Sequence, residues 1–212
     1  ELSLVQAKKE MAVFGQRVYR MMDMVKEILY ETDDEKFLKT YNRIEKYEQI
    51  SDRMEVEIAD YLTRVLEGRL SAEGKNNIRV MLRAVSEIES VADSCNNIAK
   101  IIKRRNDAKS HFTDEQNHNI EHMLALTDAA IVHMNDILHR QTGTREDMAL
   151  SYNMENEINS YRNLLKNNNI DNIDNKLYKY SDAIFYMDII SECEKLGDYV
   201  LNVVQAIVEK KL

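Results

Sequence analysis

The chain has 212 residues, 44% of them hydrophobic, which is enough to bury a sizeable core in one or two domains. It has no proline, only five glycines and many strong helix formers, so the composition favours an all-α fold. A net charge of −8 argues against a dedicated nucleic-acid binder. The apolar runs are far too short to span a bilayer, and the N-terminus lacks a signal-peptide core, so we expect no direct membrane insertion of this segment.

Turn and capping signals divide the first half into three predicted helices. Residues 31–34 (Glu-Thr-Asp-Asp) separate the first two, while Gly68 ends the second and Ser71 caps the third. Apolar residues of the third helix alternate in steps of three and four, as in a heptad seam that packs against other helices. The residues of this seam are Ile78, Met81, Val85, Ile88, Ala92, Cys95, Ala99 and Ile102.

The third predicted helix ends in the main basic cluster of an otherwise acidic chain. This cluster comprises Lys100, Lys103, Arg104 and Arg105. Cations suit the C-terminal end of a helix dipole, so we interpret the cluster as a solvated helix end. The alternative is a docking patch for a partner or a membrane surface.

The second half contains three more predicted helices. Residues 106–113 join the halves, and Thr113 with Gln116 has the spacing of a capping box. Thr144 is the expected N-cap of the fifth helix, and the Asn-rich residues 167–172 are expected to lead into the sixth.

The two halves repeat one frame. The sequence SEIESVAD at 86–93 returns as SECEKLGD at 191–198, and the same offset places a second apolar seam at 183–207. Likewise MEVEI at 54–58 returns as MENEI at 154–158. The sequence therefore predicts two tandem antiparallel three-helix bundles, over residues 1–106 and 113–212, built from six long helices.

The repeated frame places two carboxylates one turn apart, at Glu89 and Asp93 in the first half. The second helix carries the same spacing at Glu48 and Asp52. If the two helices are antiparallel neighbours, these four carboxylates converge on one side of the bundle. Oxygen donors of this kind suit a divalent or ferric cation such as Mg, Ca, Mn or Fe.

In the second half this set is smaller. The positions 100 residues after Glu48 and Asp52 are Met148 and Tyr152, which leaves Glu194 and Asp198, with Glu155 nearby. We therefore expect any metal in the first bundle. The alternative is that these are ordinary surface carboxylates, since a chain with 37 acidic residues contains several such spacings by chance.

Other reactive residue types suggest no chemistry. Cys95 and Cys193 lie on the apolar seams and are expected to be reduced core residues. Glu115 and His118, with His122 a turn later, fit an exposed first helical turn better than a metal site. We find no nucleophile–base pair or phosphate-binding loop, and predict that the chain is not an enzyme.

Two tandem three-helix units, each ending in a helix with Glu-x-x-x-Asp, resemble the PhoU family of phosphate-uptake regulators. Glu89 to Asp93 and Glu194 to Asp198 are similar to the family's Glu-Arg-Ile-Gly-Asp-like motif. Residues 10–15 (Glu-Met-Ala-Val-Phe-Gly) and the apolar positions after them look like the helix that follows the membrane part of bacterial sodium/phosphate cotransporters. A chain that starts without Met fits that origin.

The resemblance implies a cytoplasmic regulatory domain in phosphate uptake, tethered to the inner membrane through a preceding transporter domain. Its partner would be the membrane domain of a phosphate transporter or a second copy in a homodimer, and not nucleic acid. Some family members hold metal clusters, which by position nominates Glu48, Asp52, Glu89 and Asp93, then Glu194 and Asp198. The alternative is a free-standing metal-binding adaptor that represses a phosphate importer or a signalling kinase.

Overall fold

The computed structural model describes residues 2–210, which form six long α-helices and no strand. This confirms the all-α prediction. The helices are α1 (Leu2–Tyr30), α2 (Asp34–Leu66), α3 (Ala72–Asp107), α4 (Asp114–Arg140), α5 (Arg145–Asp174) and α6 (Tyr180–Glu209).

The predicted N-caps are present. The side chain of Ser71 accepts a hydrogen bond from the backbone N–H of Gly74, at the start of α3. Thr113 and Gln116 form the expected capping box of α4, and Thr144 forms a second one with Asp147 at the start of α5. Each cap satisfies N–H groups that the first turn of a helix leaves without a partner.

The Asn-rich segment was predicted wrongly. Residues 167–172 continue α5, which ends only at Asp174. Leu165 and Asn169 are buried one turn apart, and Ile173 packs against the core a turn later. This helical spacing outweighs the weak helix propensity of asparagine. The chain turns at Lys176, which has a positive φ of 60°.

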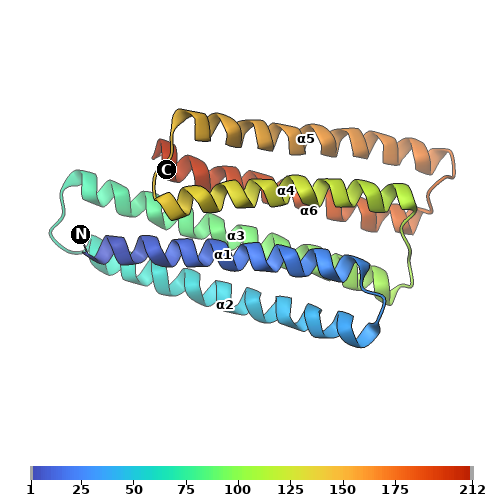
Figure 1. The fold of residues 1–212 in the computed structure, drawn as a ribbon, viewed down its shortest axis with the longest axis horizontal. Coiled ribbons are helices and arrows are strands. Elements are labelled where there is room, and N and C mark those ends of the chain that lie inside the picture. Colours follow the sequence, from blue (N-terminus) through green and yellow to red (C-terminus); the bar gives the residue numbers. More distant parts are fainter. Residues whose placement is uncertain (1, 211–212) are drawn as a thin grey trace.

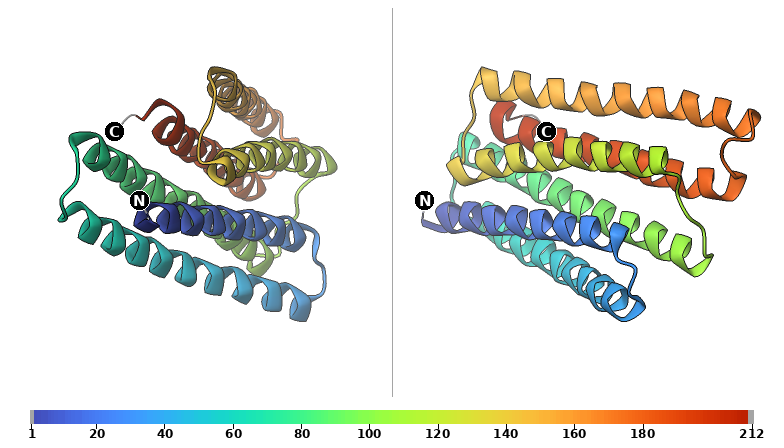
Figure 2. Two further views of the ribbon diagram at one scale, coloured as in Figure 1. Left: turned by 60° about the vertical axis from the view of Figure 1, so that its left-hand side comes forward. Right: turned by 45° about the vertical axis from the view of Figure 1, so that its right-hand side comes forward.

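The six helices form two antiparallel groups of three that lie side by side, α1 to α3 and α4 to α6 (Figure 1). Helix α3 packs along α6 and α1 along α4, whereas α2 and α5 lie on opposite outer sides (Figure 2). All eight residues of the first seam are buried, and so are those of the second except Ile207. The core therefore runs without interruption through α1, α3, α4 and α6.

Side-chain amides tie the two halves together across this contact. Asn97 of α3 donates to Glu192 of α6 at 3.1 Å, and Asn202 of α6 donates to Glu87 of α3 at 3.2 Å. Between α1 and α4, Asn135 donates to the backbone carbonyl of Gly15 at 3.0 Å. These directional bonds fix how the two apolar seams are aligned.

Two further sequence predictions meet different outcomes. Cys95 and Cys193 are free and buried, as expected of core residues. Arg105, predicted to be solvated with its basic neighbours, is instead buried. Its guanidinium donates to the carbonyl of Leu29 and lies 4.8 Å from the ring centroid of Phe112. It thus provides a donor to a carbonyl in the last turn of α1, where the helix supplies none.

Candidate functional site

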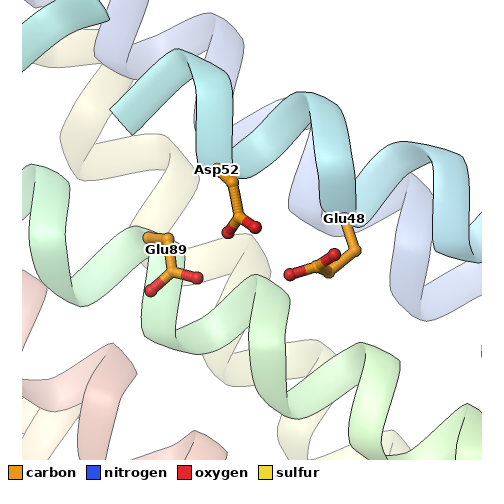
Figure 3. Close-up of side chains that lie close together, drawn as sticks. All are labelled: Glu48, Asp52 and Glu89. Atoms are coloured by element: carbon orange, nitrogen blue, oxygen red, sulfur yellow. The ribbon is translucent and has the colours of Figure 1, made fainter. Parts of the chain in front are cut away.

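Three carboxylates from α2 and α3 lie close together on the first bundle. Glu48 and Asp52 project from α2, one turn apart, toward Glu89 on α3 (Figure 3). Each offers an oxygen within 4.8 Å of an oxygen of each of the others. Within residues 2–210, no other three Asp, Glu, His or Cys side chains lie together in this way. The structure thus brings together three of the four residues nominated from the first half.

Asp93, the fourth nominated residue, is exposed, as Asp52 is, and lies near the group. Its charge raises the pKa of both Glu48 and Glu89. Glu55, one turn beyond Asp52, also belongs here, because its charge acts on Glu89. We did not predict Glu55, although the repeat of 54–58 at 154–158 aligns it with Glu155 and contained that signal.

Nearby cations hardly offset the negative charge of the cluster. Partial burial is the main reason that the pKa of Glu89 rises to about 8, followed by a hydrogen bond with Asp52 and the charges of Glu55, Asp52 and Asp93. Burial and the charges of Asp52 and Asp93 also raise the pKa of Glu48, and Lys100 opposes this only weakly. At neutral pH the cluster therefore retains a proton or needs a cation.

The donor set fits a hard cation. Carboxylate oxygens are ligands of Mg²⁺, Ca²⁺, Mn²⁺ and iron, and two helices can present them to one ion from two sides. Glu48, Asp52 and Glu89 would hold the ion, with Asp93 close enough to add to the negative potential. A bound cation would relieve the mutual repulsion that raises the pKa of Glu89.

The second bundle has a smaller group at the equivalent place. Burial raises the pKa of Asp198 to about 7, together with the charge of Glu194 and a hydrogen bond with Glu155. Glu155 also accepts a hydrogen bond from Asn159. Glu194 and Asp198 thus pair with Glu155 of α5, in a group of their own. His118 and Glu115 are exposed at the first turns of α4, as predicted.

The fold and the site define a class of protein: an all-helical chain of two matching three-helix units, each with acidic side chains between its second and third helices. None of the six described helices contains a stretch apolar and long enough to cross a membrane.

Comparison with known proteins agrees with this class. Residues 12–102, which lie within the first unit, match the model of the PhoU domain. No curated protein matches the chain significantly. The crystal structure of PhoU from Pseudomonas aeruginosa superposes with a TM-score of 0.86 at 12% identity, covering 97% of this chain and 95% of that one. The phosphate transport system regulatory protein PhoU from Streptococcus pneumoniae gives 0.81 at 16% identity, over 97% and 93%. The whole chain therefore has the PhoU fold.

Proposed function

We propose that the protein is a non-enzymatic regulator of phosphate transport that acts through contacts of its helix faces with a transporter or a signalling protein. The observation that carries this proposal is the match of residues 12–102 to the PhoU domain. The similarity of the whole fold to a phosphate transport system regulatory protein supports it.

Two versions of this function differ in how the regulator reaches its partner. The resemblance of the first helix to transporter tails favoured a cytoplasmic domain tethered to a sodium/phosphate cotransporter. The structural relatives favour the other version, because the superposition extends over 95% and 93% of two proteins described as PhoU itself. We therefore propose a free-standing PhoU-like regulator, with the tethered domain as the alternative.

Phosphate uptake tests the function. Deleting the coding region of residues 1–212 should change the rate of radiolabelled phosphate uptake in phosphate-rich medium, and restoring it should reverse the change. Affinity purification of the tagged chain should recover a phosphate transporter or a kinase. Unchanged uptake together with recovery of the chain alone would contradict the proposal.

We also propose that the first cluster binds a divalent or ferric cation through Glu48, Asp52 and Glu89, with Asp93 contributing charge. The proximity of three carboxylates carries this proposal. Glu194 and Asp198, with Glu155, form the weaker candidate in the second bundle.

Metal analysis of protein purified without chelator tests the site. The variant Asp52→Asn/Glu89→Gln should lose the metal. The control Glu57→Gln/Asp60→Asn, which neutralises two exposed acids of α2, should keep it. Equal, sub-stoichiometric metal in all three proteins would reject the site.

A further inference from the structure

A second polar site lies between the C-terminal part of α3 and the first half of α6. An open pocket of about 630 Å³ is bounded there by the two helices, with Tyr41 of α2 at its edge. Its volume falls within the range of roughly 300–1,000 Å³ that small-molecule sites occupy. The basic cluster at the end of α3 opens onto this pocket, except for Arg105, which points into the core.

The lining is basic relative to the rest of the molecule. Four cations, Lys100, Lys103, Arg104 and Lys195, face three carboxylates, those of Asp107, Asp188 and Glu192. The whole chain, in contrast, has a net charge of −8. The pocket is thus a local region of positive charge in an acidic protein.

Two of the three carboxylates already have partners. Asp107 accepts from Lys103 at 2.7 Å, and Glu192 accepts from Asn97 at 3.1 Å. Within residues 2–210, neither Lys100 nor Arg104 has a carboxylate at ion-pair distance. These two cations are therefore available to a ligand.

One neutral donor completes the lining, the hydroxyl group of Ser191. The phenol of Tyr41 lies at the edge of the pocket but is engaged by Glu45, and burial together with this contact raises its pKa to about 12. A guanidinium, an ammonium and a hydroxyl group around one space are donors that bind phosphoryl oxygens. The C-terminal end of α3 disfavours an anion, so binding would depend on these side chains and not on the backbone.

We propose that this pocket binds a small phosphorylated molecule, of the size of a nucleotide or a sugar phosphate. Lys100 and Arg104 are its main contacts. The pocket shares no lining residue with the carboxylate cluster, although the charge of Lys100 also acts on Glu48. A ligand bound there goes beyond the proposed function, because it would let the regulator respond to a small molecule. Because binding is measured on the purified chain alone, its failure is distinguishable from a failure of the transport experiment.

Isothermal titration calorimetry with EDTA present tests the pocket. The probes are ATP, glucose 6-phosphate and inorganic phosphate, with adenosine as the ligand without a phosphoryl group. At least one phosphorylated probe should bind, and Lys100→Gln/Arg104→Gln should weaken it at least about tenfold. The control Lys39→Gln/Lys166→Gln removes the same charge from exposed positions on α2 and α5 and should leave the affinity within about twofold.

Each outcome decides the proposal. If inorganic phosphate binds as tightly as the esters and the pocket variant weakens it, phosphoryl recognition stands and the free ion is its source. No heat from any phosphorylated probe at about 1 mM would overturn the proposal. Equal weakening by both double variants would also overturn it, because the anion would then respond to net charge alone. Lys100 and Arg104 are exposed, so both variants should fold, which circular dichroism verifies.

Discussion

Glu89 is the residue whose ionisation the fold alters most within the candidate metal site. Its pKa in the folded chain is about 8, against 4.5 for an ordinary glutamate. Between these two values the folded state binds more protons than the unfolded state. The stability that Glu89 contributes is therefore fully present below about pH 4.5 and is lost as the pH rises toward 8.

We predict that, in EDTA, the free energy of unfolding decreases by on the order of 1 kcal/mol between pH 5.5 and pH 8, partial exposure keeping the effect small. Glu89→Gln should flatten this decrease and raise stability at pH 8. It should not abolish the slope, because the raised pKa of Asp198 adds a decrease of its own. Urea unfolding followed by circular dichroism measures both. An identical pH profile in Glu89→Gln and in the exposed control Glu57→Gln would contradict the assignment.

Gly15 of α1 lies at the contact with α4. A Cβ there would clash with the Asn135 side chain and lie 2.9 Å from Cδ1 of Leu138. Gly15→Ala should therefore destabilise the protein by about 2 kcal/mol, as overpacking does. Gly74→Ala is the matched control: its Cβ meets nothing nearer than 3.4 Å, so the helix should gain up to about 1 kcal/mol. Thermal melts of the two variants should move in opposite directions; a common direction would refute the close-approach argument.

At the scale of the helices, the sequence predicts the features that depend on residues close together in the chain. Ser71, Thr113 and Thr144 were identified as N-caps from their spacing alone, and the seam of α3 from its period. Residues 167–172 were misjudged because asparagine signals a loop, whereas the buried contacts of Leu165 and Asn169 decide the matter. Such contacts depend on the tertiary structure and leave little trace in a local pattern.

In the candidate site, too, local spacing was predictable and tertiary contacts were not. Glu-x-x-x-Asp on two neighbouring antiparallel helices predicted that four carboxylates converge, those of Glu48, Asp52, Glu89 and Asp93. The structure groups the first three of them. Glu55 was missed because its closeness to Glu89 depends on how α2 lies against α3. The pocket at the end of α3 was not foreseen, because the pairing of α3 with α6 brings Lys195 to the basic cluster from 90 residues further along the chain.

The capping box of α4 gives a prediction at this scale. Thr113→Ala removes the acceptor for the N–H of Gln116 and should cost about 1 kcal/mol of stability. Thr63→Ala is the control, since that exposed hydroxyl only bonds back to the carbonyl of Ala59 inside a helix, where alanine is preferred. Chemical denaturation should show a lower midpoint for Thr113→Ala and an unchanged or higher one for Thr63→Ala. Equal midpoints would show that the cap contributes nothing.

At the scale of the whole molecule, the two units do not have separate cores. Helices α1, α3, α4 and α6 share one continuous apolar interior, and α3 packs along α6. The division into residues 1–106 and 113–212 stays a prediction about duplication in the sequence. Neither unit covers the apolar faces of α1 and α3, or of α4 and α6, by itself. Folding of one unit should therefore depend on the other.

A variant of Ile44 in α2 distinguishes one cooperative fold from two independent domains. Ile44 is fully buried and, among the six described helices, α2 contacts only α1 and α3. Ile44→Ala should destabilise the first unit by about 2–4 kcal/mol. If the chain unfolds as one cooperative body, the slowest-exchanging amides of α4, α5 and α6 lose the same free energy of protection as those of α3. Native-state hydrogen exchange measures this helix by helix. Unchanged protection in α4 to α6 would mean that the halves are independent domains, and that a signal bound by one reaches the other only through their shared surface.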